Sequence, residues 1–264
     1  MEEIAFLSKK ILELNKRLIE SESAKSKFLS LIASELNNPM TALLGMIPHL
    51  EIEKGEKNER HFDLISYELL RLNFRIQNLV ATAEIESGSL DVSKARLDIE
   101  ELLDEVIKSL EFAIVDRNIE IKITNEVQKE IITDPKKLYL IIKNLIANGC
   151  KYGVENGLVA VVISEKDGLL CINVKNQGEG PKVQYKPEIF TRFANRVEGK
   201  HGLGLGLSIV RELCELLDGS VDYTAEDGFV TFVASVALNE GSEDSLAYGS
   251  DEFLFESFDD AIEL

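Results

Sequence analysis

Basic residues are scarce in this chain of 264 residues. Against 47 Asp and Glu there are only 29 Lys and Arg, and the formal net charge is −18. A protein that binds along a nucleic-acid duplex neutralises many phosphates with Lys and Arg. The deficit therefore argues against direct nucleic-acid binding.

Long apolar runs are missing as well. No stretch reaches the roughly 20 apolar residues of a membrane-spanning helix, and the first residues do not have the pattern of a secretory signal peptide. We therefore expect a soluble, cytoplasmic chain without a membrane segment.

Cysteine is rare, and its spacing is uninformative for metal or redox chemistry. Cys150, Cys171 and Cys214 show no CxxC spacing and have no histidine nearby. Each lies within an apolar pattern, which predicts buried, reduced thiols. A Walker phosphate loop is also absent, because no glycine-rich turn ends in Gly-Lys-Ser/Thr.

What is present centres on the stretch from Leu138 to Gly153, LYLIIKNLIANGCKYG. Its leucines and isoleucines recur at helical spacing, which predicts a buried face. Asn144, Asn148 and Lys151 lie three or four residues apart and project together from another face. Two amides and an ammonium can hold a hydrated Mg²⁺ and the oxygens of a triphosphate. Taken alone, the stretch could also be an ordinary amphipathic helix whose amides face solvent.

Two glycine-rich stretches follow in the chain. INVKNQGEGP (Ile172–Pro181) is an alternating strand that runs into a turn, and HGLGLGLSIVRELCELLDG (His201–Gly219) is a turn that opens an amphipathic helix. Glycines before a helix let the backbone approach phosphate, and the helix N-terminus offers free N–H groups. Between the two stretches lies IFTRF (Ile189–Phe193).

The asparagine helix, the two glycine turns and IFTRF, in this order, resemble the ATP site of histidine-kinase ATPase domains. These domains form a branch of the GHKL superfamily, which includes gyrase and Hsp90-type ATPases. In this comparison, the asparagine stretch is similar to the asparagine box and IFTRF to the phenylalanine box. The resemblance implies a GHKL (Bergerat) α/β sandwich that binds ATP with Mg²⁺.

The resemblance also implies a role for each residue of the site. Asn148 would coordinate Mg²⁺, Asn144 would lie close to the same phosphates, and Lys151 would pair with a phosphate oxygen. Tyr152 would pack against the adenine. Asn176 replaces the family's usual aspartate, and its amide oxygen can accept from the adenine amino group without charge assistance. The remaining nucleotide contacts would come from Gly178, Gly180, Phe190, Gly202, Gly204 and Gly206.

The N-terminal part has a different pattern. Residues 1–26 carry a short heptad repeat, which predicts a parallel dimeric coiled coil. FLSLIASELNNPMTALLGM (Phe28–Met46) resembles the phosphoacceptor box of the dimerisation and histidine-phosphotransfer domain. A second helix is expected from His61 to Glu86. Two such hairpins would form a four-helix bundle across the axis of a homodimer.

In this box Ser34 stands at the histidine position. A serine hydroxyl is a poor nucleophile unless a base activates it, and a bare carboxylate such as Glu35 is weak for that task. Ser34 therefore argues against the usual autophosphorylation cycle. His49 and His61 are the other histidines of this region, but neither carries the surrounding box. Asn38 could instead orient a water for attack on a phosphoaspartate of a receiver domain, which needs no histidine.

We expect an α+β chain with four parts. Residues 1–26 form the coiled coil, 27–90 the phosphotransfer-like hairpin, 91–238 the ATP-binding catalytic domain and 239–264 an acidic tail. The tail holds nine acids and no Lys or Arg, which is half of the net charge, so its first half is predicted to be disordered.

The resulting functional hypothesis is a two-component signalling dimer that binds Mg-ATP and acts with a response-regulator receiver domain. Ser34, Glu35 and Asn38 are its candidate catalytic residues. The alternatives are a pseudokinase scaffold that docks on a partner kinase, a receiver-domain phosphatase, or a genuine histidine kinase with an engineered His-to-Ser change.

Overall fold

The computed structural model describes residues 56–88, 90–127, 129–180, 189–190 and 204–238, together with Lys10, Leu36, Thr41 and Leu43. The chain divides into two compact units, Met1–Leu79 and Val80–Leu264. Apart from the four single positions, the predicted coiled coil and the box around Ser34 lie outside the described residues, as does the acidic tail. The dimeric bundle therefore stays a prediction.

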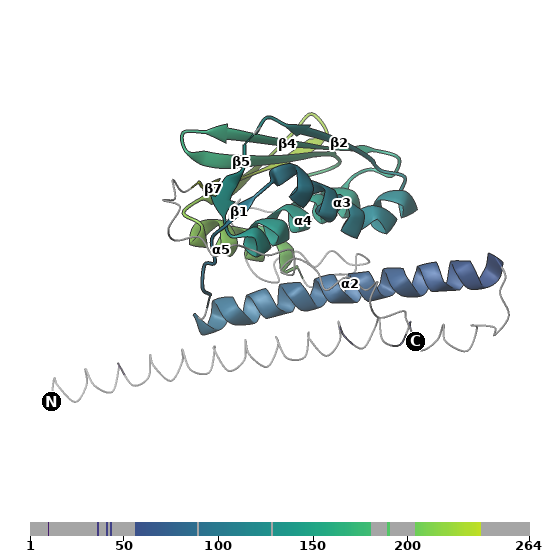
Figure 1. Cartoon of the computed structure of the whole chain (residues 1–264). Coiled ribbons are helices and arrows are strands. Elements are labelled where there is room, and N and C mark those ends of the chain that lie inside the picture. The colour runs from purple at the N-terminus through teal and green to yellow at the C-terminus, as the bar shows by residue number, and fades with distance from the viewer. Residues whose placement is uncertain are drawn as a thin grey trace. The chain divides into compact units, whose positions relative to one another are not determined.

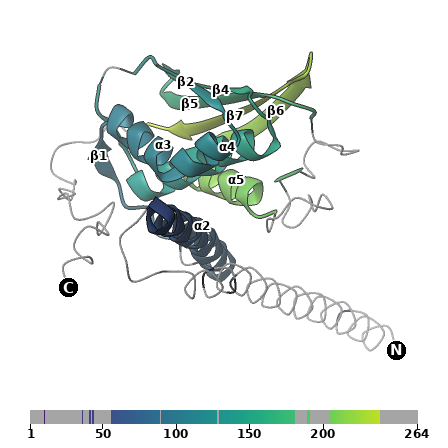
Figure 2. The ribbon, with the colours of Figure 1, turned by 90° about the vertical axis from the view of Figure 1, so that its right-hand side faces the viewer.

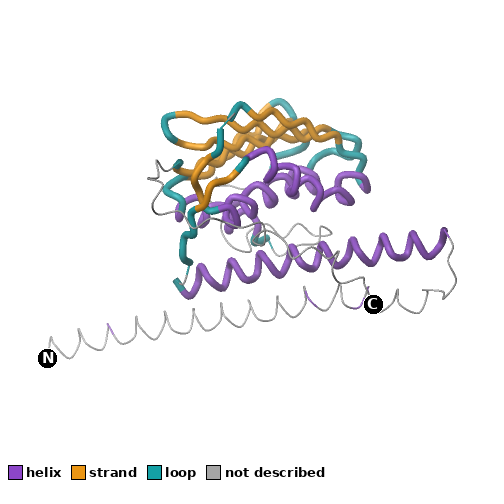
Figure 3. Tube along the Cα trace, in the orientation of Figure 1, coloured by secondary structure: helices purple, strands orange, loops and turns teal. Residues whose placement is uncertain are grey.

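One long helix, α2 (Glu56–Ser87), joins the two parts of the chain. Figure 3 shows it as a single continuous helix. It begins five residues before the predicted start and ends one residue after the predicted end. Gly88 follows with φ +67°, a left-handed conformation that glycine adopts without strain. Several large apolar side chains of this helix are exposed, among them Leu69, Leu70 and Ile76.

The second unit contains the strand predicted within Ile172–Pro181 and the helices predicted from Leu138–Gly153 and within His201–Gly219, together with further strands and helices. In chain order the elements are β1 (Ala95–Leu97), α3 (Ile99–Asp116), β2 (Glu120–Asn125), β3 (Ile131–Thr133), α4 (Pro135–Tyr152), β4 (Leu158–Lys166), β5 (Leu169–Gln177), α5 (Gly206–Leu216), β6 (Ser220–Glu226) and β7 (Phe229–Ala237).

Five of these strands form one sheet in the order β2-β4-β5-β7-β6, while β1 and β3 pair separately. β2 runs parallel to β4, and the other neighbours in the large sheet are antiparallel. Figure 1 and Figure 2 show α3, α4 and α5 together on one face of this sheet. Residues 159, 161 and 163 of β4 and residues 170, 172, 174 and 176 of β5 are buried, which gives the alternation expected of a sheet covered on one face.

Side-chain caps fix where two of the helices begin. Asp98 accepts hydrogen bonds from the backbone N–H groups of Glu100 (2.7 Å) and Glu101 (3.4 Å) at the start of α3. Asp134 accepts from Lys137 N (3.0 Å) at the start of α4, where Pro135 occupies the first turn. An Asp cap followed by a Pro in the first turn is typical of a helix start.

Two of the three cysteines are buried, as predicted. Burial raises the pKa of the Cys150 thiol to about 11 and that of the Cys214 thiol to about 12. Cys171 is only half-buried, so the prediction was wrong for this residue. It lies on the sheet face opposite to the buried Leu170 and Ile172, because successive side chains of a strand point to opposite faces. Within the described residues, no helix is long and apolar enough to cross a membrane.

Candidate nucleotide site

The asparagines of α4 lie inside the protein. Asn144 is 4% exposed, and its Nδ2 donates to the Leu140 carbonyl at 2.9 Å. Asn148 is half-buried, and its Nδ2 atom is buried without a hydrogen-bond partner among the described residues. The Asn144 amide and the Asn148 amide nitrogen therefore do not face solvent. A buried amide without a partner costs free energy unless a ligand or water completes it.

The start of α5 lies directly against these amides. A Cβ atom on Gly206 would come within 2.6 Å of Asn144 Oδ1 and 3.8 Å of Asn148 Nδ2, so any side chain there would force Asn144 to move. Gly204, two residues earlier, has φ +66°. Among the described residues, no side chain caps the first turn of α5. Its free N–H groups therefore begin next to the two asparagines, an arrangement suited to an anion.

The first glycine turn reaches the other end of the same helix. A Cβ atom on Gly178 would lie 3.1 Å from the Tyr152 carbonyl oxygen and 3.3 Å from Asn176 Nδ2. Val154 N donates to the Gln177 carbonyl at 2.9 Å, which joins the end of α4 to the end of β5. The fold thus brings both glycine turns to α4, although they are distant from each other in sequence.

The β6–β7 hairpin also takes part, and the sequence interpretation missed it. Gly178 N donates to the Gly228 carbonyl at 2.9 Å, and a Cβ atom on Gly180 would lie 2.5 Å from Ala225 Cβ. A shallow hollow is lined by Val154, by residues 177–180 and by residues 225–229. The dipeptide Asp227-Gly228, with φ of 53° and 76°, predicts a tight hairpin turn but does not by itself indicate a ligand.

The remaining predicted residues are placed as follows. Lys151 Nζ lies 4.8 Å from the ring centroid of Tyr152, and both side chains are half-buried. Asn176 is buried, and its Nδ2 donates to the Gln177 carbonyl at 3.2 Å. Phe190 is buried in an aromatic cluster with Tyr223, at 6.3 Å between ring centroids, and no described contact links it to the asparagines. Ser34, Glu35, Asn38 and Gly202 lie outside the described residues.

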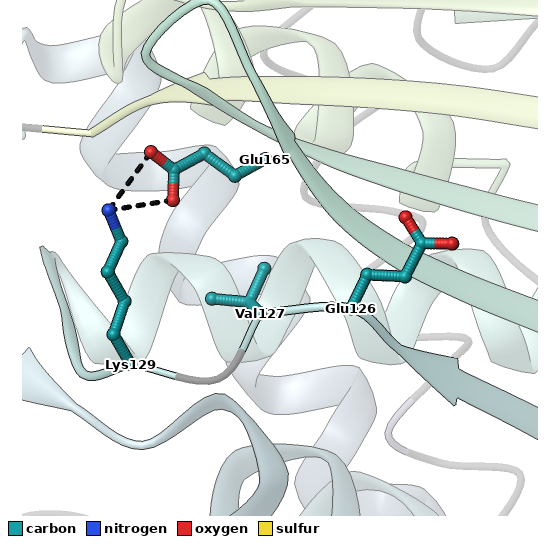
Figure 4. A pocket seen from close by; sticks show the side chains of 4 residues that line it. All are labelled: Glu126, Val127, Lys129 and Glu165. Carbon is teal, nitrogen blue, oxygen red and sulfur yellow. Dashed lines mark hydrogen bonds and ion pairs between the residues drawn. The ribbon is translucent and has the colours of Figure 1, made fainter.

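A second hollow, between Glu126, Val127, Lys129 and Glu165, contains none of the predicted residues (Figure 4). The Lys129 ammonium pairs with both Glu165 carboxylate oxygens, at 2.9 and 3.1 Å. Glu165 pairs with Leu170, whereas the Gly178 turn follows the other end of β5, near Asn176, which pairs with Val159. This hollow therefore lies at the far end of the strands.

The donor set near Asn148 fits a nucleotide with a hydrated metal ion. Mg²⁺ keeps several waters and takes few protein ligands when substrate phosphates complete its shell. Among the described residues, no group of three His, Cys, Asp or Glu side chains could hold a metal ion by itself. The unpartnered Asn148 amide and the uncapped start of α5 match a triphosphate that brings the metal with it.

Sequence comparison matches residues 133–240 to the family of histidine kinase-, DNA gyrase B- and HSP90-like ATPases. The sensor histidine kinase TmoS of Ectopseudomonas mendocina is 28% identical over 247 residues, which cover 89% of this chain and 25% of TmoS. The signal transduction histidine-protein kinase BarA of Escherichia coli K12 is 26% identical over 224 residues, which cover 80% of this chain and 24% of BarA. The chain thus spans about a quarter of the length of these relatives.

Solved structures show the same fold. The histidine kinase AdeS of Acinetobacter baumannii has a TM-score of 0.57 at 18% identity, over 78% of this chain and 98% of AdeS. Full-length ShkA in complex with AMPPNP has a TM-score of 0.58 at 25% identity, over 81% of this chain and 46% of ShkA. The second unit therefore has the GHKL-type α/β ATPase fold, and the two sequence relatives named above are histidine kinases.

Proposed function

We propose that the second unit binds Mg-ATP between α4, the Gly178 turn and the start of α5. The observation that carries this proposal is the approach of Gly206 to Asn144 and Asn148, beside an amide without a partner. The free N–H groups of α5 would bind phosphate, and Asn148 would reach the metal through its amide oxygen. The bound Mg²⁺ would neutralise charge on the triphosphate.

Two further features support nucleotide binding. Lys151, on the last turn of α4, supplies a positive charge next to Tyr152, whose carbonyl lies against Gly178. ShkA, a structural relative, was solved with AMPPNP, an analogue of ATP. Phe190, Gly202 and Gly204 stay predicted contacts, because no described contact joins them to the asparagines.

Calorimetry with Mg·AMPPNP tests this proposal. We expect the native chain to bind and Asn148→Ala to bind about tenfold more weakly or worse, because the metal loses a protein ligand. Asn173→Ala is the matched control, since this asparagine lies half-buried on β5 but on the open face of the sheet. No heat from the native chain at millimolar nucleotide would show that the site is not a nucleotide site.

For phosphotransfer, we infer from Ser34 that the chain does not autophosphorylate. A phosphate ester on serine would also be too stable to pass to an aspartate of a receiver domain. Incubation with labelled ATP should leave the native chain unlabelled. Ser34→His should acquire acid-labile label if the catalytic unit is otherwise competent. Acid-labile phosphate on the native chain would contradict the inference.

A second candidate function is receiver-domain dephosphorylation or sequestration by a homodimer. The retained Glu35 and Asn38 favour it, as does the exposed apolar surface of α2, which suits a bundle. ThkA, a relative with a TM-score of 0.52 at 21% identity, was solved in complex with the response regulator TrrA. The test measures how fast a phosphorylated receiver domain loses its phosphate. A faster loss with the native protein than with Asn38→Ala would support dephosphorylation. Binding without faster loss would support a scaffold instead.

A further inference from the structure

Arg117 connects the end of α3 to the end of α4. It is the residue that follows α3, and its guanidinium donates three hydrogen bonds to carbonyl oxygens of the last turn of α4. Nη1 donates to the Cys150 carbonyl and, at 2.6 Å, to the Lys151 carbonyl, and Nη2 donates to the Gly153 carbonyl at 2.9 Å. The charge also reaches the neighbouring thiol, because Arg117 partly opposes the rise in the pKa of Cys150 that burial causes.

The end of α4 needs such a partner. The last carbonyls of a helix have no partner within the helix, and a left-handed glycine after the helix commonly supplies one. Gly153 instead is extended, with φ −62° and ψ 166°. A side chain there would clash, since its Cβ would lie 2.5 Å from the Gly149 carbonyl oxygen. A planar, permanently charged guanidinium from another element can bind several carbonyls at once and also suits the negative end of the helix dipole.

The backbone around Arg117 is fixed to the loop after α4. The Arg117 carbonyl accepts from Asn156 N at 3.1 Å, and Asn118 Nδ2 donates to Asn156 Oδ1 at 2.8 Å. Glu120 N donates to the Gly157 carbonyl at 2.9 Å. Hydrogen bonds therefore fix both the backbone and the guanidinium of Arg117.

Arg117 binds the last turn of α4, and this turn of the helix also contacts the Gly178 turn. It carries Lys151 and Tyr152, and the Tyr152 carbonyl lies against Gly178. We propose that Arg117 is a positioning residue for the nucleotide: its guanidinium holds the last turn of α4 in the conformation that presents Lys151 and Tyr152 to the ligand. This inference rests on the proposed nucleotide function. Arg117 itself would not touch the nucleotide.

The test compares four chains: native, Arg117→Met, Arg117→Lys and the control Arg96→Met. Arg96 is an exposed arginine on β1, paired with Glu130 at 3.6 Å, so its substitution removes the same charge away from α4. Binding of Mg·AMPPNP is measured by calorimetry at a temperature at which circular dichroism shows every chain to be folded. We expect Arg117→Met to bind about tenfold more weakly. Arg117→Lys should recover part of this loss, because an ammonium can serve one or two of the carbonyls, and Arg96→Met should bind as the native chain does.

Hydrogen exchange distinguishes a local change at the end of α4 from a change in the overall stability of the fold. In Arg117→Met, amides of residues 150–154 should exchange faster while those of β5 and β7 stay as in the native chain. Saturating Mg·AMPPNP should restore the protection of these amides. If the hydrogen bonds of Arg117 favour ligand binding, ligand binding must equally favour the ordered turn.

The outcomes separate the inference from the proposed function. Native binding with unchanged affinity in Arg117→Met would overturn the inference alone, and so would unchanged exchange at residues 150–154. If the native chain itself fails to bind, the proposed function and the inference fall together. If Arg117→Met does not fold, Arg117→Lys is compared with the control Arg96→Met instead. If both variants bind Mg·AMPPNP with the native affinity and show native exchange rates at residues 150–154, the inference is overturned.

Discussion

Replacing Lys143 by methionine should stabilise the second unit. Lys143 lies on α4 and is only 5% exposed. Its ammonium lies 3.0 Å from Tyr139 Oη and 5.0 Å from the centroid of the same ring. Tyr139 in turn interacts with Ser109 and Glu105 of α3. Burial lowers the pKa of Lys143 from 10.5 to about 8. Methionine has a similar length and no charge to bury.

The pKa gives the size and the sign of the effect. A fall from 10.5 to about 8 corresponds to roughly 3 kcal/mol against the charged form in the folded state. The methionine variant avoids this penalty but loses the hydrogen bond to Tyr139, which costs it about 1 kcal/mol. We therefore expect Lys143→Met to be about 2 kcal/mol more stable at pH 7, where the lysine is charged in both states. Between pH 8 and 10.5 the unfolded chain keeps a proton that the folded chain has lost, so the native protein gains stability and the difference shrinks.

Urea unfolding followed by far-ultraviolet circular dichroism measures this difference, since the chain has no tryptophan for fluorescence. Both proteins are compared at pH 7 and pH 9.5. Cys150 and Cys214, whose raised pKa values lower stability above pH 9, affect both proteins equally and cancel in the comparison. A variant that is less stable than the native chain at pH 7, or a difference that does not change with pH, would refute the reasoning about a desolvated ammonium.

Two other substitutions probe the site and its support. Gly206→Val should abolish measurable Mg·AMPPNP binding in calorimetry while circular dichroism stays native-like, because its Cβ would lie 2.6 Å from Asn144 Oδ1 and separate α5 from α4. Asp134→Ala should lower the free energy of unfolding by roughly 2 kcal/mol in urea. Its buried carboxylate caps α4 at Lys137 N, pairs with Lys137 Nζ at 2.7 Å and accepts from Ser93 N at 2.9 Å. A loss below about 0.5 kcal/mol would argue that water replaces these bonds.

The elements of the second unit could be predicted from the sequence because their signals are local. Alternating apolar residues marked β5, and the hydrophobic spacing from Leu138 onwards marked α4. The glycines of the two turns are likewise visible in the sequence. Each of these features depends on neighbours within a few residues, which is the range that periodicity and capping describe.

Contacts between distant segments could not be predicted in this way. The sequence suggested two polar asparagines on one helix face, but not that Gly206 closes against them from about sixty positions later. The dipeptide Arg117-Asn118 has no local signature, because the role of Arg117 depends on where α3 ends relative to α4. Lys143 was also unexpected. A lysine on an amphipathic helix normally faces water, but α4 is packed against the sheet, α3 and α5 together.

The polar residues of α4 can be separated by how they affect stability with and without ligand. Lys143 faces Tyr139 and is not part of the proposed site, so its substitution should raise stability whether or not nucleotide is present. Asn148 has a buried donor without a partner in the part of the chain that the structure describes, which costs free energy in the free protein. Asn148→Ala should therefore be as stable as the native chain, or slightly more stable, without nucleotide.

With Mg·AMPPNP at about 100 times its dissociation constant, the native chain should gain roughly 2.7 kcal/mol, because the ligand binds only the folded state. Asn148→Ala should gain much less at the same concentration. If Asn148→Ala is the more stable protein without nucleotide and the native chain is the more stable one with nucleotide, Asn148 contributes to ligand binding rather than to the fold. If Asn148→Ala is strongly destabilised without nucleotide, the asparagine is structural, and its proposed contact with the nucleotide loses its main support.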